Sequence, residues 1–468
     1  MIDNIKTAST ESYLSDESKE TGYAKGVFLP GTIEEISEIM KWSFESGESI
    51  LIQGARTGVM GAAVPHGEYI LNMTCMNSIS GFSYNEETNK YCITAQAGVT
   101  LDQINNMLSS KEADTSHWSE CSIKAWEQYC KSDAVLRFPA DPTETTASIG
   151  GILATSAFGP YIKLLGRLIS YVDSFTLVEY DGRIVSGDDI NHDRYGLIEG
   201  SEGLYGAIAE MTCRLVELPK PEMSLLIGFD SYEQMTGYYE MVQRVTNISE
   251  NLYCADFFSS EAIRYVMELR KRMDEFADIP SIRERDSLWL EIYDQSYNYD
   301  NILIMLAEIA EEIGISIDDT VVVTDDRNIQ RLKKMRHAII TGFSEDSTEH
   351  SLVYDVKMDI KDLDGISGEL KQVTETSGKC KMMLMFGHVT GSFLSIRILV
   401  DKSADEILSS DMNRQIINLL KKYCSRVSSE YGIGTRKKVL NRELGTVYAV
   451  VTGEPDATSV DRKNYKMI

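Results

Sequence analysis

Residues 53–65 read QGARTGVMGAAVP and directly follow the apolar run Ile50-Leu51-Ile52. Small residues at positions 54, 55, 58 and 61 surround Arg56 and Thr57. Because these positions carry little or no side chain, backbone N–H groups can approach and surround an anion such as a pyrophosphate. The spacing matches neither a Walker A loop nor a GxGxxG fingerprint. We therefore predict a buried strand followed by an anion-binding loop, with a tight turn as the alternative.

Two more segments rich in small residues follow. Residues 137–159 read RFPADPTETTASIGGILATSAFG, and residues 199–208 read EGSEGLYGAI. The block 147–159 holds so many Ala, Ser, Thr and Gly residues that we expect its backbone to lie against a ligand instead of forming a typical core helix. Three such segments in one chain favour a bound ligand over three unrelated turns.

In this order, the three segments resemble the FAD-binding domain of the vanillyl-alcohol oxidase / p-cresol methylhydroxylase (PCMH-type) flavoprotein superfamily. Within it, the chain is similar to the D-2-hydroxyacid dehydrogenases: D-lactate dehydrogenase, the glycolate oxidase catalytic subunit and D-2-hydroxyglutarate dehydrogenase. The resemblance implies an α+β fold with a two-subdomain PCMH-type FAD-binding domain at residues 1–220. It also implies an α+β, ferredoxin-like substrate cap at 221–405 and a segment, 406–468, that returns to the FAD domain.

The resemblance also implies which residues contact FAD, through backbone donors at the pyrophosphate and small or apolar residues at the isoalloxazine. These are Gly54, Ala55, Arg56, Thr57, Gly58, Asn72, Pro142, Thr143, Gly150, Gly151, Ala154, Ser156, Gly159, Gly203, Gly206 and Ile208. Arg56 stands where relatives more often have Gly, and Thr155 and Phe158 also depart from the family pattern. Relatives that tether FAD use a His near the first loop or a Cys in the later one. Residues 54–60 contain no His and Cys213 lies past the later motif, so we expect non-covalent FAD.

In relatives, a divalent metal held by two His and one Glu polarises the substrate hydroxyl. Residues 387–395, GHVTGSFLS, resemble the family's GHxGDGNxH, with His388 at the first ligand and Ser395 in place of the second His. Residues 429–434, SEYGIG, resemble xEHGIG, with Glu430 at the acidic ligand. Two remaining protein ligands are too few for tight binding in the relatives' manner, so a divalent metal is not expected.

The resemblance makes Tyr431, Arg336 and His388 the candidate catalytic residues. Tyr431 takes the place of the His that relatives use as a base, and a phenol with a pKa near 10 is a feeble base unless a cation lowers its pKa. Lys437 and Lys438 are close enough in sequence to be that cation. Arg336 is the candidate clamp for the substrate carboxylate, and a surface position on a helix is its alternative.

Composition limits the partners of the chain. The formal net charge of −26 argues against nucleic acid as a ligand. The 8 cysteines are dispersed without any CxxC pair, so we expect no iron–sulfur or paired-Cys zinc site. We find neither a signal-peptide pattern nor a run of roughly 18 apolar residues, and therefore expect a cytoplasmic protein without a membrane span.

The resemblance implies an FAD-dependent oxidoreductase that oxidises a 2-hydroxy acid, similar to D-lactate or glycolate, by hydride transfer to flavin N5. Electrons would pass to a separate acceptor such as an electron-transfer flavoprotein, an iron–sulfur protein or a quinone. One alternative is an FAD-containing subunit of an electron-transfer complex whose hydroxyacid site has lost its metal ligand and base. Another is an enzyme with an altered substrate, in which Tyr431 acts as a hydrogen-bonding phenol. The sequence leaves a homodimer open.

Local patterns predict several elements. A capping box of Thr32 and Glu35 opens a helix that ends at Gly47, and Asp181-Gly182 marks a hairpin turn. Residues 109–136 are expected to form a surface helical insertion. Helices and strands alternate over 222–405, and a helical run near 404–428 is expected to lead back to the FAD domain. The sequence shows no internal repeat.

Overall fold

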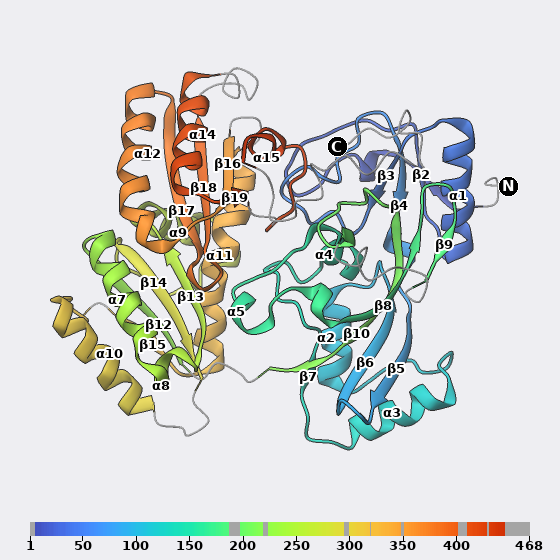
Figure 1. Cartoon of the computed structure of the whole chain (residues 1–468), viewed down its shortest axis with the longest axis horizontal. Coiled ribbons are helices and arrows are strands. Elements are labelled where there is room, and N and C mark those ends of the chain that lie inside the picture. The colour runs from blue at the N-terminus through green and yellow to red at the C-terminus, as the bar shows by residue number, and fades with distance from the viewer. Residues whose placement is uncertain are drawn as a thin grey trace.

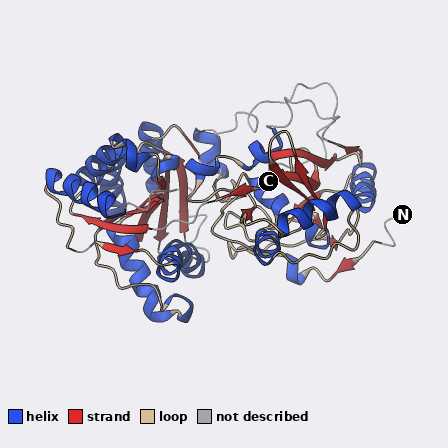
Figure 2. Cartoon of the chain, turned by 90° about the horizontal axis from the view of Figure 1, so that it is seen from below, coloured by secondary structure: helices blue, strands red, loops and turns tan. Residues whose placement is uncertain are grey.

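The computed structural model describes residues 5–186, 197–218, 223–293, 299–318, 320–347, 351–400, 410–427 and 430–444. These residues form two domains that lie side by side (Figure 1). The N-terminal domain (residues 5–218) and the C-terminal domain (residues 223–444) each have their own hydrophobic core. Figure 2 shows helices around the strands of both domains.

The N-terminal domain begins with a small sheet of four strands in the order β1-β2-β4-β3. The strands are β1 (Thr7–Ala8), β2 (Gly26–Phe28), β3 (Ile50–Gln53) and β4 (Tyr69–Asn72). Helix α1 (Ile33–Ser46) connects β2 to β3. Its N-cap Thr32 accepts from the Glu35 N–H, the Glu35 carboxylate accepts from the Gly31 N–H, and Gly47 ends it with φ 71°. The predicted strand and helix, with both helix ends, are therefore confirmed.

A second sheet in this domain has five antiparallel strands in the order β5-β6-β10-β8-β9. The strands are β5 (Ile79–Asn85), β6 (Lys90–Gln96), β8 (Val172–Val178), β9 (Ile184–Val185) and β10 (Ala207–Arg214). Strands β8 and β9 form the predicted hairpin, with Gly182 at φ 84° in its turn. The short strands β7 (Leu136–Arg137) and β11 (Val216–Glu217) pair with each other beside this sheet.

Helices α2 (Leu101–Ser110), α3 (Glu120–Cys130), α4 (Ile149–Thr155) and α5 (Ile162–Leu165) complete the domain. The expectation that 147–159 would not form a core helix is wrong for α4, whose Ile149, Ile152 and Leu153 are buried. A Cβ at Gly150 would lie 2.6 Å from the Ala97 Cβ. Small residues therefore allow α4 to pack closely against its own domain.

The insertion at 109–136 is part of the domain core as well as its surface. Trp118, Trp126 and Tyr129 are buried around Phe82 of β5, with ring centroids 5.1–6.5 Å from the Phe82 ring. The Trp118 Nε1–H donates to the carbonyl of Ile79 at 2.6 Å. The expectation of a surface insertion is therefore wrong for α3, because its aromatic face covers the outer strand of the five-stranded sheet.

The C-terminal domain is built on an antiparallel sheet of eight strands in the order β15-β12-β14-β13-β17-β18-β16-β19. Its first half comprises β12 (Met223–Phe229), α7 (Tyr232–Arg244), β13 (Leu252–Phe258), β14 (Asp286–Ile292), α10 (Tyr299–Ile313) and β15 (Val321–Val323). Its second half comprises β16 (Ser351–Lys357), α12 (Leu363–Ser377), β17 (Cys380–His388), β18 (Phe393–Val400), α14 (Asp411–Tyr423) and β19 (Arg426–Val427).

Each half has the order of a ferredoxin-like βαββαβ unit, and the two halves join where β13 pairs with β17. The expected ferredoxin-like α+β cap is therefore confirmed, and this one domain contains two ferredoxin-like units. No repeat was apparent in the sequence, because the two copies share topology and packing positions instead of residue identities.

Two layers of helices cover this sheet. Helices α7, α10, α12 and α14 pack on one face, while α9 (Ser260–Arg272) and α11 (Asp326–Ser347) pack on the other. The second face also receives Met60 of the N-terminal domain and Tyr431. Successive residues of a strand point to opposite faces, so every second residue of β13, β17 and β18 points toward the domain interface.

The chain returns to the N-terminal domain later than the sequence suggested. Helix α14 belongs to the C-terminal core through Met412, Ile416 and Leu420, because its apolar side lies on the sheet. The return is made by residues 430–437, where the Thr435 hydroxyl donates to the Met60 carbonyl at 3.2 Å and Arg436 Nε donates to Glu20 at 2.8 Å. Helix α15 (Lys438–Leu444) follows.

The packing of α3 makes a prediction for stability. Trp126→Ala should lower the free energy of unfolding of the N-terminal domain by about 3–5 kcal/mol, the usual cost of removing a buried Trp. Lys124→Ala on the exposed side of the same helix should change it by less than about 0.5 kcal/mol. Urea denaturation followed by far-ultraviolet circular dichroism measures both variants. Equal, small effects would mean that α3 is only a surface appendage.

Candidate functional site

Two buried amides hold the loop after β3. The Gln53 side chain donates to the carbonyls of Tyr13 and Ala63 at 2.9 and 2.6 Å. The Asn72 side chain donates to Gln53 Oε1 and to the Gly54 carbonyl, both at 3.2 Å. Asn72, predicted to contact FAD, thus fixes the start of the loop, while Gln53 ties its start to its end. Sequence reasoning missed Gln53, although a polar residue at the end of an apolar strand is a usable signal.

The held loop fits an anion. None of the N–H groups of Gly54–Gly58 donates a hydrogen bond to another described residue. A Cβ added at Gly58 would meet nothing within 4 Å. Arg56 has φ 61°, and its guanidinium lies 4.7 Å from the Tyr13 ring centroid. A succession of unused backbone donors beside open space is what a pyrophosphate requires.

The three small-residue segments meet. A Cβ at Gly54 would lie 2.4 Å from the Ser148 Oγ, which places the first loop against the start of α4. The N–H of Glu202 donates to the Ala154 carbonyl at 2.8 Å, which joins the second segment to the third. A Cβ at Gly203 would lie 3.3 Å from Ile52 of β3. The structure therefore brings together the segments that the sequence assigned to one cofactor.

The other predicted FAD contacts divide into two groups. Gly159, Gly206 and Ile208 serve packing, since a Cβ at Gly159 or Gly206 would overlap the carbonyl of Asp141 or Val178, and Ile208 is buried in β10. Pro142, Thr143 and Ala154 are only partly buried, and Ser156 accepts from Arg167 at 2.6 Å. Cys213 is fully buried in the domain core and His66 is exposed.

The interface face of the C-terminal sheet carries a set of buried polar side chains on neighbouring strands. These are Asp256 on β13, Glu291 on β14, Asp355 on β16, His388 on β17, and Ser395 and Arg397 on β18. Asp256 is directly opposite His388, and Asp355 is directly opposite Ser395. Burial of so many polar groups in one patch is costly unless they pair with one another or bind a ligand.

His388 is the centre of the first group. Its Nδ1 lies 2.7 Å from Asp256 Oδ1, and its Nε2 lies 2.9 Å from Glu430 Oε1. Burial and the nearby Arg336 hold the pKa of His388 well below its ordinary value, so the ring is neutral. Burial also raises the pKa of Glu430 to about 8. We assign the Nδ1 proton to the bond with Asp256, because a carboxylate only accepts, so that Nε2 accepts from the Glu430 carboxylic acid.

This arrangement does not fit a metal of the relatives' kind. His388 and Glu430, the two retained ligand positions, are hydrogen-bonded to each other through Nε2, and His388 Nδ1 is hydrogen-bonded to Asp256. The part of the chain that the structure describes contains no group of three or more His, Cys, Asp or Glu side chains placed to hold a metal ion. The prediction about a divalent metal itself stays a prediction.

The neighbours of Arg336, which is buried, and of Tyr431, which is partly buried, bear on the roles predicted for them. Arg336 is buried instead of lying on the surface, but it already pairs with Asp256, and its Nη2 lies 3.0 Å from His388 Nδ1. Burial, with the neighbouring Glu430, raises the pKa of Tyr431 well above its ordinary value. Lys437, one of the two lysines that could have lowered the Tyr431 pKa, instead pairs through its ammonium with Asp355 at 2.9 Å.

A second group surrounds Asp355. Its Oδ1 accepts from the Ser395 hydroxyl at 2.7 Å and lies 3.0 Å from Arg397 Nη1, while Lys437 approaches its Oδ2. The two cations outweigh the cost of burial and hold the pKa of Asp355 below its ordinary value. Ser395, which replaces a metal-ligating His, thus serves to position a carboxylate. Sequence reasoning missed Asp256, Asp355 and Arg397.

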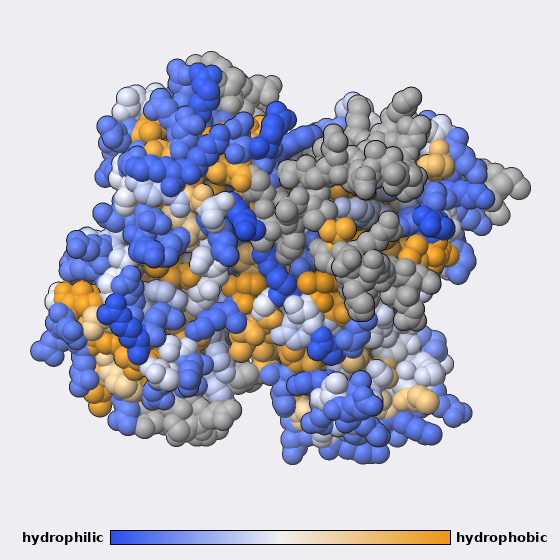
Figure 3. Space-filling model, viewed as in Figure 1, coloured by the Kyte–Doolittle hydropathy of each residue, from blue (hydrophilic) through white to orange (hydrophobic). Residues whose placement is uncertain are grey.

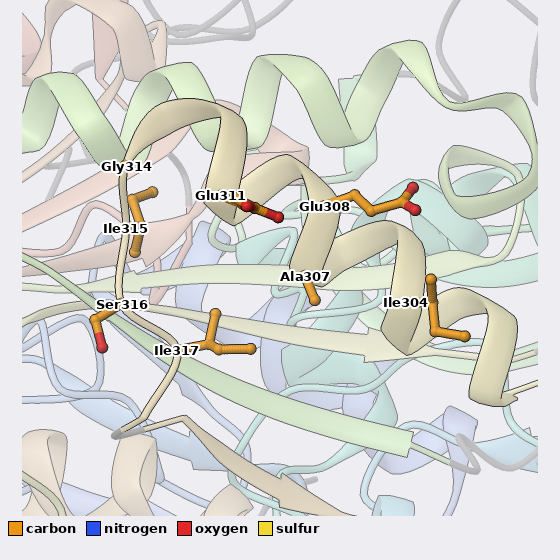
Figure 4. Close-up of a pocket in the computed structure, with 8 residues that line it drawn as sticks. All are labelled: Ile304, Ala307, Glu308, Glu311, Gly314, Ile315, Ser316 and Ile317. Atoms are coloured by element: carbon orange, nitrogen blue, oxygen red, sulfur yellow. The ribbon is translucent and has the colours of Figure 1, made fainter.

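A surface hollow of about 500 Å³ lies away from these groups. It is lined by α10 and the segment after it, including Ile304, Ala307, Glu311, Ile315 and Ile317 (Figure 4). Figure 3 shows hydrophobic side chains gathered over the same helix. Its lining contributes two carboxylates and the Ser316 hydroxyl but no cation, so it offers no chemistry comparable to that of the interface.

Comparisons with known proteins agree with this arrangement. Residues 24–125 match the model of an FAD binding domain, and residues 218–449 match that of the FAD linked oxidases, C-terminal domain. The chain is 23% identical over 448 residues to the D-2-hydroxyglutarate dehydrogenase of Xanthomonas citri pv. viticola, covering 92% of this chain and 86% of the relative. It is 29% identical over 232 residues to the D-lactate dehydrogenase of Anaerostipes hadrus, covering 48% and 43%.

Solved structures support the fold alone. An alkyldihydroxyacetonephosphate synthase superposes with a TM-score of 0.60 at 14% identity, covering 86% of this chain and 73% of that one. Among the described residues, no helix has the length and apolar character to cross a membrane. With matching models in both domains and an FAD-compatible loop in the N-terminal one, the chain belongs to the FAD-linked oxidases of the PCMH-type flavoprotein superfamily and is an FAD oxidoreductase acting on a hydroxyl group.

Proposed function

We propose that the protein oxidises a small 2-hydroxy acid at the domain interface and passes the electrons to a separate acceptor. The observation that carries this proposal is the Asp256–His388–Glu430 chain, a buried neutral imidazole joined to a carboxyl group whose pKa is raised to about 8. Such a pair can accept a proton once Glu430 is ionised, above a pH of about 8. The D-2-hydroxyglutarate and D-lactate dehydrogenases among the relatives support a hydroxy acid as substrate.

In the proposed reaction, the residues of this chain handle the proton. Asp256 orients the His388 ring through Nδ1, much as a carboxylate orients the histidine of a hydrolase triad. Once ionised, Glu430, which lies 2.9 Å from His388 Nε2, receives the proton of the substrate hydroxyl and as the acid again donates to Nε2. FAD, when bound, supplies the acceptor for the two electrons that leave the substrate carbon. Tyr431, with its raised pKa, serves as a hydrogen-bond donor instead of a base.

A second candidate is an FAD-containing subunit of an electron-transfer complex. It is favoured by the hydrogen bonds of His388, because both ring nitrogens already have partners within the protein and none is left for a substrate. This candidate predicts that FAD binds but that no hydroxy acid delivers electrons to it. The acceptor, the assembly and the cytoplasmic location stay predictions.

Anaerobic mixing separates the two candidates. Purified FAD-loaded protein is mixed with a panel of D- and L-2-hydroxy acids, and the flavin absorbance is followed. The proposed oxidoreductase should lose its yellow colour rapidly with at least one D-acid. Failure with every acid, together with reduction by a co-purifying protein, would favour the electron-transfer subunit.

The clamp on the first loop makes a prediction for FAD affinity. Gln53→Ala frees the carbonyls of Tyr13 and Ala63, so the loop loses its fixed shape and FAD should bind about tenfold or more weakly. Titration of the apoprotein with FAD, followed by flavin fluorescence, measures this change. Gln128→Ala, on the exposed side of α3, should bind FAD as the parent does. Equal affinity of Gln53→Ala and the parent would mean that the loop needs no clamp.

Glu430 makes a prediction for the pH dependence. Its pKa is raised to about 8, so it is protonated below that pH and becomes an acceptor only above it. The rate of flavin reduction should therefore rise with pH through about 8 and then level off. The charged and titratable groups that face Glu430 are Asp141, Arg336, Asp355, His388, Tyr431 and Lys437.

Glu430→Gln tests this assignment in stopped-flow measurements. The variant should lack the rise and reduce FAD about 100-fold or more slowly, as expected for loss of a general base. Glu443→Gln removes an exposed carboxylate on α15 that pairs with Lys421, and it should keep the parent profile. An unchanged profile in Glu430→Gln would assign the proton to another group.

A further inference from the structure

Arg397 is a buried cation with unused donors. Only 2% of its side chain is exposed, and neither of its terminal nitrogens makes a hydrogen bond to a described residue. Asp355 Oδ1 lies 3.0 Å from Nη1 but without hydrogen-bond geometry. A buried guanidinium that keeps its donors free is costly, because the donors have left water without gaining acceptors.

The residues directly opposite Arg397 on the sheet offer no further side-chain acceptor. Its partners across the neighbouring strands are Leu384 on β17 and Val353 on β16, both apolar. The rings of Phe386 and Tyr431 lie over it, with centroids 5.9 and 5.4 Å from Cζ. These contacts keep water from the guanidinium, while neither terminal nitrogen donates to a described residue. A planar guanidinium in this state is suited to bind an oxyanion.

The other buried guanidinium of the described residues is already neutralised. Arg336 pairs with Asp256, so the charge of this guanidinium is balanced by one carboxylate. Asp355, in contrast, faces both Arg397 and Lys437 and also accepts from Ser395. Its negative charge is divided between two cations, so positive charge is left at Arg397 and not at Arg336.

Arg397 also lies beside the proton-handling group. The Tyr431 ring, which covers Arg397, is 6.4 Å from the Phe393 ring, and the Phe393 ring is 5.5 Å from the His388 ring. A continuous row of side chains thus joins the unused guanidinium to the imidazole. A small acid held at Arg397 would have its carboxylate at one end of this row.

We propose that Arg397, and not Arg336, binds the carboxylate of the substrate, and that the site takes a 2-hydroxy acid with a single carboxylate. The inference rests on the proposed function and narrows its substrate class. A second carboxylate would need another unneutralised buried cation, and Arg336 does not supply one. Lys437 and Ser395 act as positioning residues, because they hold Asp355 beside the guanidinium.

The test uses two acids that cannot be oxidised, because a methyl group replaces the hydrogen on the hydroxyl-bearing carbon. These are 2-hydroxy-2-methylpropanoate, with one carboxylate, and 2-hydroxy-2-methylbutanedioate, with two. Their dissociation constants from the FAD-loaded protein are measured by titration calorimetry and by the change in flavin absorbance. Binding is thus measured without turnover.

The parent should bind the monocarboxylate about tenfold or more tightly than the dicarboxylate, because the second carboxylate is desolvated without a partner. Arg397→Gln should weaken monocarboxylate binding about 30-fold or more, and Arg397→Lys, which keeps the charge but not the fork, by about three- to tenfold. Arg414→Gln, a surface control on α14, should bind as the parent does.

The inference is overturned if Arg397→Gln binds the monocarboxylate as tightly as the parent, or if the dicarboxylate binds more tightly. If Arg397→Gln fails to fold, two other measurements still test the inference. These are the dissociation constant of the monocarboxylate from Arg397→Lys and the ratio of the two dissociation constants in the parent. Flavin reduction by a hydroxy acid together with unchanged binding in Arg397→Gln would retain the proposed function and reject this residue. If Arg397→Gln loses binding but no acid reduces the flavin, Arg397 is retained as the carboxylate-binding residue and the proposed function is rejected.

Discussion

The carboxylate of Glu202 joins the two domains at the site, and the remaining geometry depends on it. Glu202 lies in the third small-residue segment at φ 48° and accepts from the N–H groups of Ile433 and Gly434 at 2.5 and 3.1 Å. Burial raises the pKa of Glu202, and these two hydrogen bonds oppose that rise. The segment that it holds carries Glu430, Tyr431 and Lys437. A side chain of the N-terminal domain therefore positions the charged groups of the C-terminal one.

The buried charges beside this contact are arranged in pairs. Moving a carboxylate or an ammonium out of water costs several kcal/mol per ion, which a well-placed partner must offset. Asp256 with Arg336, Glu291 with Lys333 at 3.5 Å, and Asp355 with Lys437 meet this requirement. Glu430 avoids the cost differently, because its raised pKa keeps it protonated and hydrogen-bonded to His388. The group that departs from this balance is Arg397.

The features that could be predicted from the sequence are those with a local signature. The capping box at Thr32 and Glu35 and the turn at Gly182 each need only a few neighbouring residues. Family motifs also placed His388 and Glu430 in one site, although they gave no hint that the two bond to each other. Strand β13 escaped prediction, because all seven of its residues are buried and no alternation marks it. Asp256 on that strand was missed with it.

Arg397 could not be predicted for a different reason. In the strand FLSIRILV, at residues 393–400, an arginine among apolar residues has the pattern of a half-exposed strand, yet every residue there is buried. Its meaning comes from long-range contacts, with Asp355 contributed by β16 and the covering Tyr431 by the last described segment.

The same long-range contacts explain how Ser395 and Arg397 can function together where relatives have a second metal-ligating His. A metal provides concentrated positive charge next to the substrate oxygens. Here the Ser395 hydroxyl holds Asp355, and Asp355 in turn holds the permanently charged guanidinium of Arg397. Positive charge is thus kept at the buried sheet face without a metal ligand set. The neutral His388, fixed by Asp256, is left to hold Glu430, the group that accepts the proton.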